Sequence, residues 1–138
     1  MSLVEKQQQL IARLRIIEDP HERLAAIVAR GRKWPALAEP ERTEASRVQG
    51  CVSPVWLAGS LDAGRCRFRV TAESPLVQGL AALLCELYDG EPAEEVGALE
   101  PELFDELGLS RQLSPTRLNG LANVRRVIRE FAQSVVAS

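Results

Sequence analysis

The chain has 138 residues, of which 46% are hydrophobic and 26% charged, and its formal net charge is −2. This length and composition are typical of one soluble globular domain that can bury a core. The slight acidic excess argues against a nucleic-acid-binding protein, so we expect a single domain spanning residues 1–138 with no nucleic-acid partner.

Export and membrane signals are also missing from the sequence. No stretch approaches the ~18 consecutive apolar residues that a membrane span requires, which argues against a membrane partner. The first residues, MSLVEKQQQ, lack the basic-then-apolar order of a signal peptide, which predicts a cytoplasmic protein. The cysteines are odd in number (Cys51, Cys66 and Cys85), so reduced thiols are expected rather than a disulfide framework.

Two helices are predicted before the first loop. Apolar residues at helical spacing indicate a helix over about residues 3–17. Asp19 is a candidate N-cap for a second helix, with Pro20 at its first position and Glu22 completing a pattern like a capping box. We expect this helix to reach about Arg30 and to stop at Gly31. Residues 34–47 are then predicted to be mostly loop, with a helical turn near residues 41–44.

A strand-rich middle follows this loop. Short strands are predicted at residues 48–51, 55–61 and 66–72, and the turn chemistry of residues 62–64 favours a hairpin between the last two. Alternation in the third strand places Cys66 on its apolar face and three arginines on its other face.

The second half of the chain is predicted to be helical. Ser74 caps a leucine-rich helix that should pack centrally on the sheet and end at Gly90. Residues 91–96 and 101–107 indicate two short helices, and Gly108 terminates the second of them. A final helix begins at residues 114–115, with its arginine cluster at positions 125, 126 and 129 off the apolar stripe and facing solvent. The predicted fold is α+β, a small, about three-stranded antiparallel sheet flanked by helices.

Among the cysteines, Cys51 alone is predicted to lie in a loop. Cys66 and Cys85 fall on packed elements and are interpreted as structural thiols. Cys51 lies between Gly50 and the Ser53–Pro54 break, and loops on rigid scaffolds are where chemistry is usually placed. The residues alone leave two readings open for Cys51, a small buried hydrophobe or a sulfur nucleophile.

Other kinds of site have little support. The cysteines are too widely spaced for a zinc site, and His21 is the only histidine, so neither a metal site nor a Cys-His dyad is expected. No glycine-rich phosphate-binding pattern is present. In the last helix, a close backbone contact would explain Gly120, and contacts to a neighbouring loop would explain Arg117 and Asn119, although an ordinary helix start is an equal alternative.

Three ordered segments together resemble the SufE family of sulfur acceptors. They are residues 47–57 (RVQGCVSPVWL), 77–84 (VQGLAALL) and 113–121 (LSPTRLNGL). The resemblance covers nearly the whole chain and implies helices packed on a small antiparallel sheet.

The resemblance implies a function. A protein of this kind takes persulfide sulfur from a cysteine desulfurase by transpersulfidation, stimulates that enzyme and relays the sulfur to an iron–sulfur cluster scaffold protein. Cys51 is then the acceptor, with Gly50, Ser53, Arg117 and Asn119 supporting its loop and pocket. No cofactor is implied for this chain, since pyridoxal phosphate would belong to the desulfurase.

Two rival functions remain. The protein could be an adaptor that regulates a desulfurase by binding alone, without carrying sulfur. A thiol–disulfide oxidoreductase is disfavoured, because no C-x-x-C pair supplies a resolving thiol. The resemblance implies a carrier with no independent turnover, and whether it is an enzyme is left open.

Overall fold

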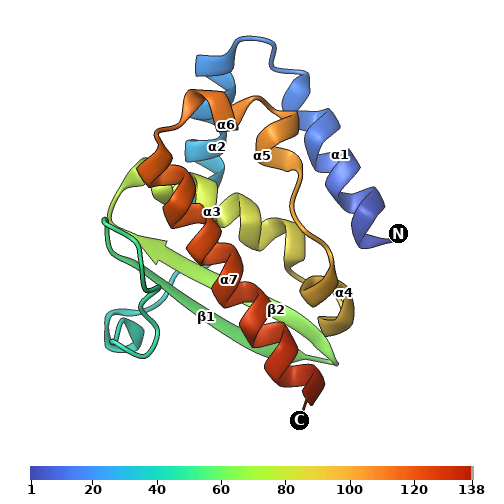
Figure 1. The fold of residues 1–138 in the computed structure, drawn as a ribbon, viewed down its shortest axis with the longest axis vertical. Helices are drawn as coiled ribbons and strands as arrows, with labels where there is room; N and C mark the ends of the chain where they lie inside the picture. Colours follow the sequence, from blue (N-terminus) through green and yellow to red (C-terminus); the bar gives the residue numbers. More distant parts are fainter. Residues whose placement is uncertain (138) are drawn as a thin grey trace.

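The structure is a computed structural model and describes residues 1–137. Its helices and strands follow the chain in this order: α1 (Leu3–Arg15), α2 (Pro20–Arg32), the 3-10 helix η1 (Glu39–Glu41), β1 (Val55–Asp62), β2 (Arg65–Ala72), α3 (Pro75–Tyr88), α4 (Ala93–Ala98), α5 (Leu103–Glu106), α6 (Leu109–Gln112) and α7 (Pro115–Ala137). Figure 1 shows α7 running across the β-hairpin, with α1 and α2 at the opposite end of the molecule from the C-terminus.

The predicted hairpin forms as β1 and β2, which pair antiparallel along their whole length. Ala63 and Gly64 make the turn with φ of 52° and 80°, the conformation that suits the right-handed twist of a hairpin. Cys66, Phe68 and Val70 are buried on one face of β2, so the predicted alternation is confirmed.

The first predicted strand, residues 48–51, does not form. Only an isolated antiparallel bridge forms, with Arg47 opposite Trp56. The amide of Val48 donates to the carbonyl of Val55 at 2.8 Å and the amide of Leu57 to that of Ser46 at 2.9 Å. Gly50 has φ of +86°, which turns the chain away from β1. The described residues therefore contain a two-stranded sheet, and this loop folds toward α7 instead.

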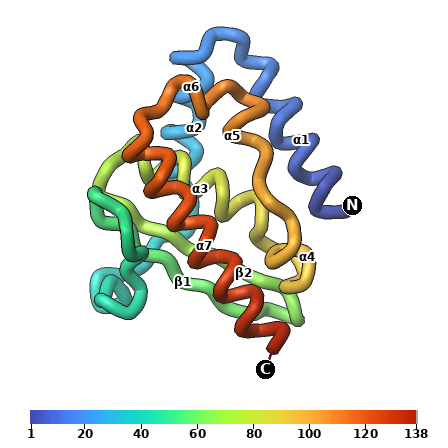
Figure 2. Tube along the Cα trace, in the orientation of Figure 1, coloured from blue at the N-terminus to red at the C-terminus, as the bar shows by residue number. Residues whose placement is uncertain are grey.

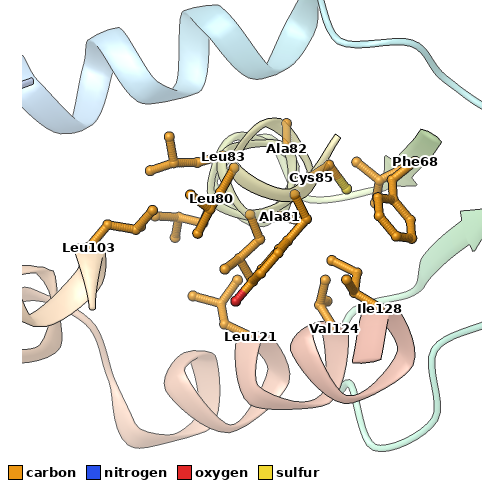
Figure 3. Close-up of a cluster of buried hydrophobic side chains, with 14 of the residues drawn as sticks. Phe68, Leu80, Ala81, Ala82, Leu83, Cys85, Leu103, Leu121, Val124 and Ile128 are labelled. Carbon is orange, nitrogen blue, oxygen red and sulfur yellow. The ribbon is translucent and has the colours of Figure 1, made fainter. Parts of the chain in front are cut away.

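Helix α3 is the centre of the core, as its leucines predict. The Ser74 hydroxyl accepts from the amide of Val77 at its start, which confirms the predicted cap. The helix packs on β2, α2, α1 and α7. Side chains of α3 and α7 point toward one another in the buried cluster of Figure 3, together with Phe68 from β2 and Leu103 from α5.

The predicted stop at Gly31 is wrong, since α2 continues through it to Arg32. Gly31 lies where α2 crosses α3, and a Cβ built on it would be 2.4 Å from the Cα of Gly79. Glycine is needed here because the two helix backbones meet without side chains between them. The Asp19 cap is confirmed, as its carboxylate accepts from the amides of residues 21 and 22.

The prediction that the arginines of the last helix all face solvent is wrong for Arg125. Its side chain is only 5% exposed. It donates to the carbonyls of Val96 and Leu99 at 2.9 and 2.8 Å, and its guanidinium carbon lies 4.4 Å from the Tyr88 ring centroid. Arg125 therefore fastens α4 and the segment after it to α7 and α3.

Smaller differences concern boundaries. The first helix ends at Arg15, the helical turn after α2 lies at Glu39–Glu41, and α4 begins at Ala93. Gly108 does end the preceding turn, but with φ of +74° it also starts α6, a helix that the sequence did not predict. The fold is α+β, as predicted. No helix within residues 1–137 is long and apolar enough to cross a membrane.

Candidate functional site

Cys51 lies in the loop between η1 and β1, a segment that Figure 2 shows passing beside α7. Hydrogen bonds join this loop to the N-terminal half of α7. Its side chain is partly buried, and its Sγ donates a hydrogen bond to the carbonyl oxygen of Gly120 at 3.4 Å. The contact at Gly120 is thus made through its carbonyl oxygen. The predicted close backbone approach is not found, because a Cβ on Gly120 would lie 3.7 Å from the Cys51 Sγ, an ordinary contact.

Gly50 gives the loop the shape that brings Cys51 to α7. Its positive φ is strained for residues with a side chain. A Cβ on Gly50 would also lie 2.5 Å from Nδ2 of Asn123, whereas the Gly50 carbonyl accepts a 3.1 Å hydrogen bond from that same nitrogen. Both the conformation and the space at this position therefore favour glycine.

A pocket of about 380 Å³ opens beside the thiol. It lies between the Cys51 loop and the starts of α3 and α7, and it is lined by Cys51, Val52, Ser53, Ser74, Val77, Ser114, Thr116, Arg117, Gly120 and Leu121. Two of the predicted supporting residues, Ser53 and Arg117, are thereby brought together with Cys51. Asn119 is exposed and does not line this pocket.

Burial governs the protonation of Cys51. Removal from water raises the pKa of its thiol above the ordinary value, and the charges of Arg126 and then Arg47 oppose this shift without cancelling it. Both charges come from residues other than Arg117, the arginine that the sequence analysis placed beside this loop. The isolated protein therefore holds Cys51 mainly as a neutral thiol at pH 7.

The other two cysteines are buried in the core. Cys66 faces inward on β2 and Cys85 lies within α3, both with no exposed surface. Burial raises the pKa of each thiol. Their interpretation as structural residues is confirmed by this placement, which leaves Cys51 as the thiol that reaches a pocket.

Two residues of the site, Asn123 and Arg126, were not predicted from the sequence. Asn123 donates to the carbonyl of Gly50, and Arg126 donates to the carbonyl of Gln49 at 3.2 Å. Asn123 lies three residues after Gly120 and Arg126 three residues after Asn123, so each is a neighbour of the one before it on the helix surface. That spacing from the conspicuous Gly120 is the signal that could have found them.

The site offers one thiol and no general base. His21 lies at the exposed start of α2, where its amide is bonded to Asp19. Within the described residues, no three His, Cys, Asp or Glu side chains converge as metal ligands would. Because the thiolate and not the neutral thiol is the nucleophile, Cys51 has to lose its proton before it can attack another sulfur atom.

Comparisons with known proteins identify the family that the chain resembles. The SufE family, described as an Fe-S metabolism associated domain, matches residues 8–132. An uncharacterized SufE-like protein of Rhizobium etli is 35% identical over 130 residues, which cover 91% of this chain and 88% of that protein. The sulfur acceptor protein CsdE of Escherichia coli is 37% identical over 106 residues, or 75% of this chain and 70% of that protein.

The fold has also been observed before. The solution structure of a hypothetical protein from Thermus thermophilus superposes with a TM-score of 0.80 and covers 96% of this chain and 97% of its own. The two sequences are 23% identical. This likeness bears on the fold alone.

Proposed function

The chain belongs to the SufE family, and on that premise we propose that it is a sulfur-acceptor protein of iron–sulfur metabolism that takes persulfide sulfur onto Cys51. The observation that carries the proposal is the position of this thiol. Cys51 is partly buried in a loop beside a pocket, whereas Cys66 and Cys85 lie inside the core.

In the proposed reaction, this chain supplies the Cys51 thiolate and the partner supplies the persulfide. The Cys51 thiolate attacks the outer sulfur of a partner's persulfide, and a new S–S bond forms at Cys51. The partner's own S–S bond breaks, and its cysteine leaves as a thiolate that takes up a proton. The sulfur is transferred without net oxidation or reduction, so no metal, oxidant or redox cofactor is required of this protein.

Shelter is as important as reactivity for such a carrier. A persulfide exposed to cellular thiols would be reduced by them. The pocket beside Sγ has room for one more sulfur atom, and the loop and α7 cover its sides. The raised pKa of the resting thiol also limits its reaction with other electrophiles.

The proposed donor is a cysteine desulfurase that carries its own pyridoxal phosphate, and the proposed recipient is an iron–sulfur scaffold protein. The name of the Escherichia coli relative, a sulfur acceptor, supports the carrier role. We propose that the protein stimulates the desulfurase by removing its persulfide, and that this takes place in the cytoplasm.

A turnover assay tests the proposal. The purified protein is added to cysteine desulfurase and cysteine, and sulfide release is measured with a reductant present. Wild type and the Cys66→Ala control should raise the rate, whereas Cys51→Ser should not. Stimulation by Cys51→Ser equal to that of wild type would mean that the protein acts by binding alone and would overturn the acceptor role.

A further inference from the structure

Arg126 bonds through all three of its guanidinium nitrogens, one to the acceptor loop (residues 42–54, which carry Cys51) and two to other side chains of α7. Nη2 donates to the carbonyl oxygen of Gln49 at 3.2 Å. Nε donates to Oδ1 of Asn123 at 3.4 Å, and Nη1 donates to Oε1 of Glu130 at 2.9 Å. The two side-chain partners on α7 hold the guanidinium in place, and its third bond reaches the loop.

Asn123 makes the second connection. Because its Oδ1 accepts from Arg126, its Nδ2 is directed toward the loop, where it donates to the carbonyl oxygen of Gly50 at 3.1 Å. The two bonded carbonyls belong to the two residues directly before Cys51. A motion that lifts the loop backbone off α7 must break these two bonds together with the contact between Cys51 and Gly120.

We propose that Asn123 and Arg126 are positioning residues that form a latch: they hold the acceptor loop on α7 and so set how readily Cys51 becomes accessible. The inference rests on the proposed sulfur-acceptor function, since it concerns the same thiol. It adds the residues that control access to that thiol.

The strength of the latch fits a loop that must both close and open. Gln49 and Gly50 are exposed, so water can bond their carbonyls when the loop leaves α7. A hydrogen bond of this kind has a modest net value, so removing one should increase the open fraction about fivefold. Since the bonds are side chain to backbone, they hold the loop while leaving the loop's own side chains free.

Arg126 has a second effect that separates it from Asn123. Its positive charge favours the Cys51 thiolate, as does the charge of Arg47. Arg117 also lines the pocket beside the thiol. Loss of the Asn123 bond should therefore change the accessibility of the thiol and leave these charges in place. Loss of the Arg126 charge should change both accessibility and the apparent pKa.

The test is the rate of Cys51 alkylation by iodoacetamide across a range of pH, followed on the Cys51 peptide by mass spectrometry in the full chain. Asn123→Ala should raise the high-pH rate about fivefold, the value of one lost bond. Arg126→Gln should raise it similarly and also give a higher apparent pKa than Asn123→Ala. Arg129→Gln is the matched control, because Arg129 lies one turn further along α7 and pairs with Glu100.

The outcomes separate the latch from the proposed function. High-pH rates of both variants within twofold of wild type would overturn the latch, since each should exceed that limit. Equal increases in the Arg129→Gln control would also overturn it, because they would reflect general loosening of α7. Alkylation requires no desulfurase, so a latch confirmed in this way stands even if wild type accepts no sulfur, and thermal unfolding of each variant verifies that it is folded.

Discussion

The thiol of Cys51 donates its proton to the carbonyl oxygen of Gly120, with Sγ and the oxygen 3.4 Å apart. A carbonyl oxygen can only accept, so this contact stabilises the neutral thiol rather than the thiolate. Burial acts in the same direction. The closed loop is therefore a resting arrangement, and the reactive thiolate has to be generated as the loop moves or as a partner contributes charge.

The first prediction concerns the pH dependence of Cys51 reactivity. Alkylation of the folded protein should rise with a midpoint above the ordinary pKa of a cysteine, because burial disfavours the charged form more than Arg126 and Arg47 favour it. The unfolded chain in denaturant is the control and should titrate at the ordinary value. A midpoint in the folded protein at or below that of the unfolded chain would contradict the closed, neutral resting state.

The second prediction concerns the pH dependence of stability, which follows from the same raised pKa of Cys51. The pKa of Cys51 is raised in the folded state. The Cys51 thiol of the unfolded chain therefore loses its proton at a lower pH than the same thiol in the native protein. The stabilisation from this thiol is present below the ordinary cysteine pKa and is lost as pH rises through the folded pKa. Cys51→Ala should therefore weaken the loss of stability at alkaline pH, as urea unfolding at pH 7 and in the alkaline range can measure.

Gly50→Ala should disturb the acceptor loop more than a comparable glycine substitution elsewhere. A Cβ there would meet Asn123 at 2.5 Å, in addition to the strain of φ at +86°. We expect a loss of sulfur acceptance and a faster alkylation of Cys51, since the loop can no longer lie on α7.

Gly64→Ala provides the control for Gly50→Ala. Gly64 has a similar φ of +80°, but a Cβ there would have no atom within 4 Å. Gly64→Ala should lower the free energy of unfolding only by the backbone strain of about 1–2 kcal/mol and leave the alkylation of Cys51 unchanged. Equal effects of the two substitutions on alkylation would show that the contact with Asn123 is unimportant.

Arg125→Ala should be strongly destabilising. Its loss leaves the carbonyls of Val96 and Leu99 without their donor and removes the cation from the Tyr88 ring. We expect a cost of about 2–4 kcal/mol in urea unfolding. Arg129→Ala should cost about 0.5 kcal/mol or less, because Arg129 makes a surface ion pair. A cost at Arg125 below about 1 kcal/mol, less than a typical buried bond, would contradict its structural role.

Gly79→Ala should also destabilise the fold, at the crossing of α2 and α3. Its Cβ would lie 2.7 Å from the Cα of Val28, so the two helices would have to separate. The expected cost is about 1–3 kcal/mol, although alanine is the better helix former. Gly97→Ala in α4 is the control, since its Cβ would meet only ordinary contacts at 3.8 Å or more, and it should stabilise by up to about 1 kcal/mol.

Local signals in the sequence were sufficient for the hairpin and for most helices. Alternation in β2, the turn before it and the Ser74 cap each depend on neighbouring residues, and each is found as predicted. The apolar stripe of α3 likewise identified the centre of the core. Cys51 was singled out by elimination and by the glycine and proline near it.

The errors lie where distant segments meet. Gly31 has the local signature of a helix stop, and only the approach of α3 explains why it lies within α2. Arg125 is a charged residue on a helix with many charges. Nothing near it in sequence indicates that it contacts the Tyr88 ring and bonds to the carbonyls of Val96 and Leu99. The expected strand at residues 48–51 was lost because Gly50 turns the loop onto α7.

The side-chain amide that bonds to the acceptor loop was also missed by reasoning from neighbouring residues. The family resemblance implied Asn119 as a residue that supports the loop, whereas in the structure the amide of Asn123, one helical turn further on, bonds to it. Residues that contact a loop from a helix lie on one helix face, so positions three apart are better candidates than adjacent ones.

The most direct test of the account is to locate the transferred sulfur. The protein is incubated with a cysteine desulfurase and cysteine, free thiols and persulfides are then alkylated, and the Cys51, Cys66 and Cys85 peptides are examined by mass spectrometry. The account predicts an added mass of about 32 Da, one sulfur atom, on the Cys51 peptide and on neither of the others. Sulfur on Cys66 or Cys85, or an equal adduct on the Cys51→Ser protein, would contradict it.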